Sequence, residues 1–445
     1  MPSHRLARAL RLSARSLVCF LASPPAHQPH RPNGRYSNKP FAHLSAALAL
    51  SLPLLAPAQT ATPLPALGLD AKGVTVSGLS SGGYMAAQFE VVHAASLAGA
   101  AVVAGGPYAC AAGSVTTAML TCSCPYDTSG GDDSLGALTT DFSRQACLTL
   151  PPDVLASRAQ RAVQRNAAYI DAPSALRRHR VWLYSGDDDP VVFPSVVDSL
   201  QRFYGDMKVP TAQLRRVHGP RAGHGMPVIS GGSCELTRPP FINGCNIDGA
   251  GELLNWLYPR ATPPQPPTAP STGALQPFDQ TPYRQAGVFD GLDDSGWVYI
   301  PAACASGQAR CGLHVAFHGC EQGQSFPMGG APFGTRFVEG AGYNRWAEAL
   351  NLVVLYPQVR RSEGDTLGSP FRFNPKGCWD FWGYTQASGD ASLFASAPPY
   401  ARRDAPQIRA VKAMVDALLA PRSAAPQSAT LAPARGRQAA ALSAD

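Results

Sequence analysis

The run Gly78-Leu79-Ser80-Ser81-Gly82 decides the fold, because it is the only G-x-S-x-G in the chain and it stands between two segments of different character. A β-like run, 73–77, leads into it, and a helix-like run, 84–92, follows it. Strand, tight turn and helix make up a nucleophile elbow, in which glycines let the backbone pass closely and the central serine is held with its Oγ exposed. We therefore expect Ser80 to be a nucleophile, with an ordinary Gly-rich turn as the alternative.

The composition indicates a basic N-terminal leader followed by an ordinary globular region. The chain has 445 residues with 45% hydrophobic content, enough for one large α/β domain or two smaller ones. Residues 1–58 hold seven of the 37 Lys and Arg and no Asp or Glu, which leaves 30 basic and 30 acidic residues in the remainder. The formal charge of +7 thus belongs to the leader, and the body offers no electrostatic reason to expect a nucleic-acid partner.

The leader is typical of an export signal. Arg35 and Lys39 precede an apolar run, 44–56, and Ala56-Pro57-Ala58 fits the small-x-small cleavage rule. The run is too short and too interrupted by proline to span a bilayer. We predict that 1–58 is a leader that directs the chain to the periplasm or the medium, without a transmembrane segment in the mature chain. A disordered Ala/Pro-rich tail is the alternative.

Cysteine usage agrees with export. Removing the leader leaves an even number of cysteines, at positions 110, 122, 124, 147, 234, 245, 304, 311, 320 and 378. An even set in an exported chain favours disulfides, with Cys304–Cys311 and Cys234–Cys245 as the short-range candidates. Metal binding is the rival interpretation, but 122–124 has one residue between its cysteines where a zinc knuckle has two. We expect no metal and no cofactor.

We predict that the chain consists of two halves separated by a proline-rich segment. Residues 70–258 alternate strand-like and helix-like segments, 259–277 contain seven prolines, and the alternation returns in 278–420. We expect a single domain, 59–420, with 259–277 as a linker or long loop and 421–445 as a disordered tail. The expected strands are 98–105, 181–185, 296–300, 313–317 and 352–356, and the expected helices beyond the elbow are 251–258 and 407–419.

An acid and a base are needed to activate the serine, and in α/β hydrolases they follow it in the order nucleophile, acid, histidine. Asp187, Asp188 and Asp189 come directly after the strand-like run 181–185, and any of the three fits. Asp189 is favoured because it ends the turn. Among the histidines that follow, His224 lies in a glycine-flanked loop suited to catalysis, whereas His218 follows a strand-like run and is expected to cap it.

The oxyanion hole points to a rearranged chain. One donor should be the amide after the nucleophile, Ser81, and the second normally lies on a His-Gly loop after an earlier strand. No such loop precedes Ser80, but the run 313–317 ends in His318-Gly319-Cys320. We therefore predict a circularly permuted α/β hydrolase with a mostly parallel central sheet stapled by disulfides, and Cys320 as the second donor. Less favoured alternatives make His318 a second base, or His314 and His318 metal ligands.

Several separate motifs in the right order make a family resemblance specific. They are 78–85, 240–246 with 248–250, 317–320, 355–358 and 374–384. Together they resemble exported poly(3-hydroxybutyrate) depolymerases of the branch whose catalytic domain is a circularly permuted α/β hydrolase. The resemblance covers most of 70–420 and implies a serine esterase that cleaves polyester chains of (R)-3-hydroxybutyrate.

The resemblance also implies roles for residues. Ser80 is then nucleophile, Asp189 acid and His224 base, and the Ser81 and Cys320 amides form the oxyanion hole. An aromatic residue of 378–382 is expected to line the cleft. The candidates for substrate contact are Trp379, Trp382 and Tyr84, and a place in the core is the alternative for both tryptophans.

Two other functions stay open from the sequence. One is a secreted esterase acting on feruloyl or acetyl groups of plant walls, and the other is a non-catalytic relative that binds polymer surfaces. Only an Ala/Pro-rich tail follows Leu419, so amorphous polymer or soluble oligomers are the expected substrates. The expected partner is the polyester or ester substrate, and the chain is expected to be a monomer.

Overall fold

The computed structural model describes residues 61–123, 151–262, 264–265, 272–364, 372–386 and 399–422. All of them belong to one compact unit, Ala58–Asp445. The expected leader, 1–58, and the expected tail from 423 onward lie outside the described residues, as do Cys124 and Cys147.

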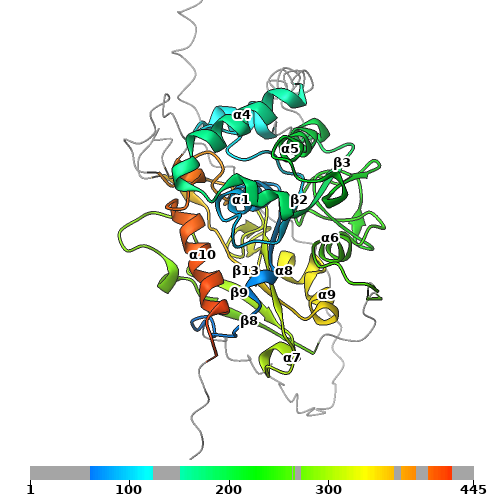
Figure 1. The fold of residues 1–445 in the computed structure, drawn as a ribbon, viewed down its shortest axis with the longest axis vertical. Coiled ribbons are helices and arrows are strands. Elements are labelled where there is room, and N and C mark those ends of the chain that lie inside the picture. The colour runs from blue at the N-terminus through cyan, green and yellow to red at the C-terminus, as the bar shows by residue number, and fades with distance from the viewer. Residues whose placement is uncertain are drawn as a thin grey trace, which may run out of the picture. The chain divides into compact units, whose positions relative to one another are not determined.

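An eight-stranded sheet in the order β4-β3-β2-β1-β10-β13-β9-β8 forms the centre of the unit (Figure 1). The strands are β1 Val74–Leu79, β2 Gly99–Val103, β3 Arg180–Gly186, β4 Leu214–Gly219, β8 Ala274–Asp279, β9 Ser295–Ile300, β10 Gly312–Phe317 and β13 Leu352–Tyr356. Neighbours from β4 to β13 are parallel, and β9 and β8 add two antiparallel pairings. The inner strands are mostly apolar and buried along nearly their whole length, as expected for parallel strands covered on both faces.

The strand order confirms the predicted rearrangement of the chain. The first half of the chain supplies β1 to β4 and the second half supplies the other four strands, so the halves meet where β1 pairs with β10. That pairing runs in register from Val74 opposite Leu313 to Gly78 opposite Phe317. The described chain also ends close to where it begins, because the Gly68 amide donates to the Ala420 carbonyl at 2.8 Å. Ends that lie side by side are the condition under which a fold tolerates permutation.

Helices pack on the sheet, and the elbow helix is the most buried of them. The longer helices are α1 Ser81–Val92, α4 Pro152–Arg165, α5 Pro194–Asp206, α6 Gly249–Leu257, α9 Tyr343–Leu350 and α10 Pro406–Leu419. All twelve residues of α1 are buried, which is the pattern of a helix enclosed by the protein on every side. The helices expected at 84–92, 251–258 and 407–419 are present as α1, α6 and α10. The helices α4, α5 and α9 were not predicted from the sequence.

Short elements complete the unit around the sheet. The short helices are α2 Val115–Thr117, α7 Ala302–Ala305 and α8 Arg336–Gly340. The short strands are β5 Met226–Val228, β6 Gly232–Ser233, β7 Ile242–Gly244, β11 Pro327–Met328, β12 Ala331–Pro332, β14 Ser362–Glu363 and β15 Phe373–Asn374. The β5-β7-β6 sheet matters for the site, because its three strands belong to the segment that directly follows the expected base, His224.

The predicted linker was too long at its C-terminal end. Residues 274–277, assigned to the proline-rich segment 259–277, begin β8, in which Pro277 lies opposite Trp297 of β9. β8 is the last strand of the sheet, and an edge strand tolerates proline because no further strand needs its N–H groups. Within the described ranges, the outer side of β8 meets only an isolated bridge, between Thr62 and Phe278. Proline content alone therefore misplaced this boundary.

Four disulfides staple the described chain: Cys110–Cys122, Cys234–Cys245, Cys304–Cys311 and Cys320–Cys378. The two short-range pairs named from the sequence are confirmed. In the described ranges no group of three or more His, Cys, Asp or Glu side chains is arranged to hold a metal ion. No helix within those ranges is long and apolar enough to cross a bilayer.

A buried histidine links β1 to β10 through hydroxyl groups. His314 Nδ1 and Nε2 each lie 2.7 Å from a hydroxyl oxygen, of Thr75 and Ser77 respectively. Those hydroxyls are bonded in turn to Tyr258 at 2.7 Å and Tyr343 at 2.8 Å. Burial lowers the pKa of His314 to about 3, so the ring is neutral. Both ring nitrogens are occupied, and the metal-ligand alternative for His314 loses its donor atoms.

His93, which ends α1, offers a test of how buried histidines set acid stability. Burial lowers its pKa to about 4, and its Nε2 has no hydrogen-bond partner among the described residues. An unfolded chain binds this proton near pH 6.5, so stability is fully present above that pH and falls as the pH drops toward 4, by about 1.4 kcal/mol per unit.

His93→Leu removes this titration without breaking a ring hydrogen bond to the described residues. The free energy of unfolding, measured with urea, should then fall less steeply between pH 6.5 and 4.5 than in the wild type, by about 1.4 kcal/mol per pH unit, and the two proteins should show equal slopes from pH 6.5 to 7.5. Equal slopes for the two proteins below pH 6.5 would contradict the assignment.

Candidate active site

Ser80 stands at the junction of β1 and α1 in a strained backbone conformation. Its φ of 57° and ψ of −123° are unusual for a residue with a side chain, and such strain is concentrated at functional sites. The turn is held by the Ser80 amide, which donates to the Val103 carbonyl at 2.9 Å. A Cβ on Gly78 would lie 2.1 Å from the Gly82 carbonyl oxygen, and one on Gly82 would lie 2.4 Å from the His318 carbonyl oxygen. Glycine is therefore required on both sides of the serine.

The favoured acid and base are bonded to each other. Asp189 Oδ2 lies 2.8 Å from His224 Nδ1, and the side chains are 0% and 6% exposed. The other carboxylate oxygen accepts the Val191 and Val192 amides at 2.8 and 2.9 Å, which fixes the carboxylate in its turn. With Nδ1–H donating to Asp189, Nε2 of His224 is left as the acceptor that a general base needs.

The alternative acid Asp187 and the alternative base His218 form a separate pair. His218 Nδ1 lies 3.1 Å from Asp187 Oδ1, and these side chains are 51% and 43% exposed. Asp188 is exposed on the same turn. The structure therefore holds two Asp–His pairs at the ends of β3 and β4, of which only one is buried.

The loop after β10 lies against the serine. A Cβ on Gly319 would be 3.3 Å from Ser80 Cβ and 3.3 Å from the Leu79 carbonyl oxygen. Cys320 follows Gly319 and is bonded to Cys378. Ser81 opens α1, where the first amides of a helix lack intrahelical partners and carry its positive dipole end. The two amides expected to form the oxyanion hole thus belong to the two segments that flank Ser80.

His318 is held as a structural residue. Its Nδ1 donates to the Gly319 carbonyl at 2.7 Å, and its Nε2 accepts the Val359 amide at 3.2 Å. Burial lowers the pKa of His318 to about 4. With both nitrogens used and no exposed surface, this ring has no free atom for the second-base or metal-ligand alternatives.

Two of the three aromatic candidates for substrate contact lie in the core. Trp379 is 0% exposed and packs edge-on against Phe317 at 4.9 Å between ring centres. Tyr84 is 1% exposed, stacks on Phe381 at 4.4 Å and donates its hydroxyl to the Cys122 carbonyl. This placement favours the core alternative for Trp379 and gives Tyr84 the same role. Trp382 is half-buried and keeps some exposed surface.

Two residues beside the site, Gln322 and Phe241, were not predicted from the sequence to have a role there. Gln322 Oε1 accepts the Gly319 amide at 2.6 Å, while its Nε2 donates to the Pro240 carbonyl at 2.7 Å. The ring of Phe241, the next residue, meets the His224 ring edge-on at 6.0 Å. Both residues fall within or directly beside quoted motifs, but spacing along the chain does not show which loop an amide side chain reaches.

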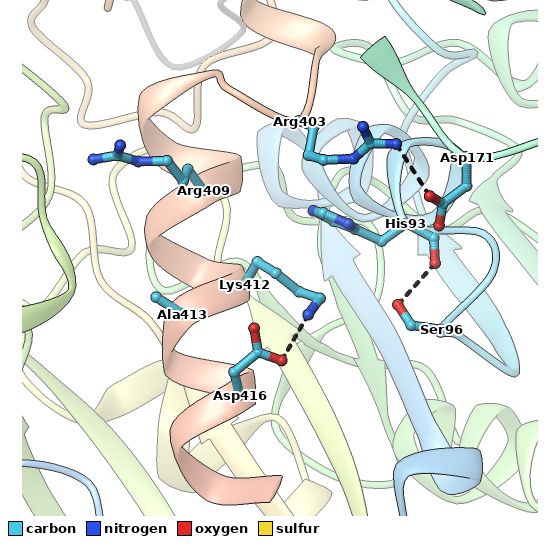
Figure 2. Close-up of a pocket in the computed structure, with 8 residues that line it drawn as sticks. All are labelled: His93, Ser96, Asp171, Arg403, Arg409, Lys412, Ala413 and Asp416. Atoms are coloured by element: carbon cyan, nitrogen blue, oxygen red, sulfur yellow. Dashed lines mark hydrogen bonds and ion pairs between the residues drawn. The ribbon is translucent and has the colours of Figure 1, made fainter. Parts of the chain in front are cut away.

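A separate cavity of about 450 Å³ lies beside the far end of α1 (Figure 2). His93 lines it, about 18 Å along a twelve-residue helix from Ser80. Its carboxylates are neutralised, because Arg403 lies 3.2 Å from Asp171 and Lys412 lies 2.6 Å from Asp416. Figure 2 shows the His93 ring directed toward α10. The cavity is distinct from the serine site, and its paired charges select no class of ligand.

The curated proteins that are similar to this chain are depolymerases of one polyester class. The chain is 34% identical over 375 residues to the poly(3-hydroxybutyrate) depolymerase of Delftia acidovorans, which covers 84% of this chain and 65% of that protein. It is 33% identical over 344 residues to the polyhydroxybutyrate depolymerase of Talaromyces funiculosus, covering 74% of this chain and 88% of that one. No protein-family model matches the chain.

A solved structure is also similar. It is a PHB depolymerase in which a serine is replaced by alanine, complexed with an R3HB trimer. The TM-score is 0.62 at 29% identity, over 80% of this chain and 99% of that one. The chain spans about two thirds of the length of the Delftia protein, 65%, and nearly all of the crystallised one.

The buried position of Tyr84 leads to a prediction. Tyr84→Phe removes one buried hydrogen bond and should lower the free energy of unfolding by about 1 kcal/mol, while KM for a soluble ester stays unchanged. Urea unfolding and steady-state kinetics measure the two effects. A several-fold rise in KM without loss of stability would restore Tyr84 as a substrate contact.

Proposed function

The chain belongs to the poly(3-hydroxybutyrate) depolymerase family, and we propose that it is a secreted serine esterase that hydrolyses ester bonds of poly(3-hydroxybutyrate) or its oligomers. The observation that carries the proposal is the buried Asp189–His224 pair at 2.8 Å in a chain whose only G-x-S-x-G serine sits on a strained elbow. Family membership supplies the substrate class, and the site supplies the chemistry.

In the proposed reaction, Ser80 is the nucleophile and His224 the general base. His224 Nε2 takes the Oγ proton as Oγ bonds to the ester carbonyl carbon, and Asp189 stabilises the imidazolium that forms. The imidazolium then protonates the departing hydroxyl end of the polyester, which leaves an acyl-enzyme on Ser80. Water, deprotonated by the same histidine, attacks that ester and releases the acid and the free serine.

The Ser81 and Cys320 amides are proposed to bind the negative charge of the tetrahedral intermediate. Backbone donors suit this task because they are held in place before the charge develops. The Cys320–Cys378 disulfide and the contact of Gly319 with Ser80 support that arrangement. Loss of one such donor typically costs about 3 kcal/mol of transition-state stabilisation.

Substrate and location follow from the same site and from the covalent structure. Trp382, half-buried beside the aromatic cluster, is the proposed contact for the polyester. The disulfides fit an oxidising compartment outside the cytoplasm, and the leader 1–58 is proposed to direct export to it. We propose that the protein acts as a monomer and needs neither metal nor cofactor.

Clearing of an amorphous poly(3-hydroxybutyrate) suspension tests the function. The mature chain from Gln59 should clear the suspension and also hydrolyse a chromogenic butyrate ester, and Ser80→Ala should abolish both activities. Ester hydrolysis without clearing would restrict the substrate to soluble oligomers or to esters such as feruloyl groups. Esterase activity that survives in Ser80→Ala would overturn the assignment of the nucleophile.

The two Asp–His pairs provide a matched test of the acid. Asp189→Asn should lower kcat by about 10⁴-fold, because the amide no longer holds His224 in the tautomer that accepts the serine proton. Asp187→Asn makes the same change in the exposed pair and should alter kcat less than about two-fold. Steady-state rates on the butyrate ester measure both. Similar losses in the two variants would contradict the assignment of Asp189.

A further inference from the structure

We infer that Gln322 is a positioning residue that holds two loops in one fixed arrangement. The oxyanion loop follows β10 and contains Gly319 and Cys320, and the histidine loop runs from β4 to β7 and contains His224 and Pro240. The inference rests on the proposed function, since it concerns the geometry of the same reaction. It assigns a role to a side chain that touches neither the reacting atoms nor the substrate.

The two hydrogen bonds of the Gln322 amide reach two different loops. Its Oε1 accepts the Gly319 amide at 2.6 Å, within its own loop after β10. Its Nε2 donates to the carbonyl of Pro240, 82 positions away in the chain, at 2.7 Å. The side chain is 1% exposed, so water cannot easily replace either bond. One planar amide therefore bridges the loop of Cys320 and the segment that leads into β7.

Each bonded loop is in direct contact with a reacting residue. Gly319 packs against Ser80, where even an added Cβ would lie 3.3 Å from Ser80 Cβ. Pro240 precedes Phe241, whose ring meets the His224 ring at 6.0 Å and 78°. Phe241 has a φ of +53°, a strained conformation that its surroundings must maintain. The Gln322 bridge thus ends on one side at Gly319, which packs on Ser80, and on the other side one residue before Phe241, whose ring packs on His224.

Other contacts fix each loop separately but do not join them. Cys320–Cys378 and the Lys376–Glu321 ion pair at 3.0 Å tie the oxyanion loop to the segment before Trp379. Cys234–Cys245 and the His224 amide bond to Thr237 Oγ1 at 2.9 Å hold the histidine loop. Among the hydrogen bonds described between these loops, the Gln322–Pro240 bond is the link. Because a misplacement of about 1 Å can cost about 100-fold in rate, such a link bears directly on kcat.

Gln322→Glu keeps the hydrogen bond to Gly319 but removes the one to Pro240. The carboxylate still accepts the Gly319 amide, but its second oxygen faces the Pro240 carbonyl oxygen and cannot donate. Protonation restores a donor at that position, and burial raises the pKa of a carboxyl group into the accessible range. The nearby titrating groups are Glu321, Lys376, His318 and His224. They are common to both proteins, so the ratio of variant to wild-type kcat cancels their contribution.

The experiment measures kcat and KM on a chromogenic butyrate ester from pH 5.5 to 8.5. Gln322→Glu should lower kcat by about 10- to 100-fold at pH 8.5, with KM changed less than about three-fold, and the deficit should shrink at least about three-fold by pH 5.5. Gln322→Met, of similar volume and uncharged, should lower kcat by a pH-independent factor. Gln324→Glu, the same chemical change two residues on, should leave kcat near the wild-type value because Gln324 bonds Trp297 and Ser295 instead.

The outcomes separate this inference from the proposed function. A wild type without esterase activity would refute the proposed function itself. An active wild type with unchanged kcat in Gln322→Met, or in folded Gln322→Glu at pH 8.5, would overturn the role of Gln322. A deficit in folded Gln322→Glu that persists unchanged at pH 5.5 would overturn it as well. Circular dichroism establishes folding, and if Gln322→Glu does not fold, the kcat of Gln322→Met decides.

Discussion

The parallel pairing of β1 with β10 is the constraint on which the rest of the structure depends. It joins segments more than 230 positions apart, from Val74 opposite Leu313 to Gly78 opposite Phe317. Because both strands run the same way, their carboxyl ends reach the same edge of the sheet. The elbow that follows β1 and the loop that follows β10 therefore emerge side by side. Gly82 then allows a contact with the His318 carbonyl that any larger residue would prevent, and Gly319 packs closely on Ser80.

Buried polar groups make that junction specific as well as stable. The hydroxyls of Thr75 and Ser77 on β1 hold His314 of β10 at 2.7 Å on both ring nitrogens, so a shift of register would strand several polar atoms in the core. A one-residue slip would also turn every side chain of the strand to the other face. The network thus fixes the alignment of the elbow relative to the oxyanion loop. A purely apolar interface would set this alignment less strictly.

Much of this arrangement was predictable from the sequence because its signals are local. The elbow needs glycines at fixed positions, strands of a covered parallel sheet are short apolar runs, and a His-Gly loop after the linker revealed the permuted order. The predicted pairing of Asp189 with His224 followed from chain order and loop context. Tyr84 and Trp379, named from the sequence as candidates for substrate contact, lie in the core instead, because the signal for their placement is not local. Composition does not reveal which face of a fully buried helix or segment meets the cleft, and both side chains point into the core.

Long-range polar contacts could not be predicted from the sequence. Gln322 lies two residues beyond the His318-Gly319-Cys320 run, yet its partner, the Pro240 carbonyl, is 82 positions away, and no periodicity relates the two. The permutation gives this contact its importance. The proposed nucleophile, acid and base all come from the first half of the chain, whereas the Gly319–Cys320 loop comes from the second. Rotation or translation of one half against the other would leave the Asp189–His224 pair intact while it displaced the proposed oxyanion donor. A fold assembled in this order therefore needs side-chain bonds that cross between the halves at the site, in addition to the sheet beneath it.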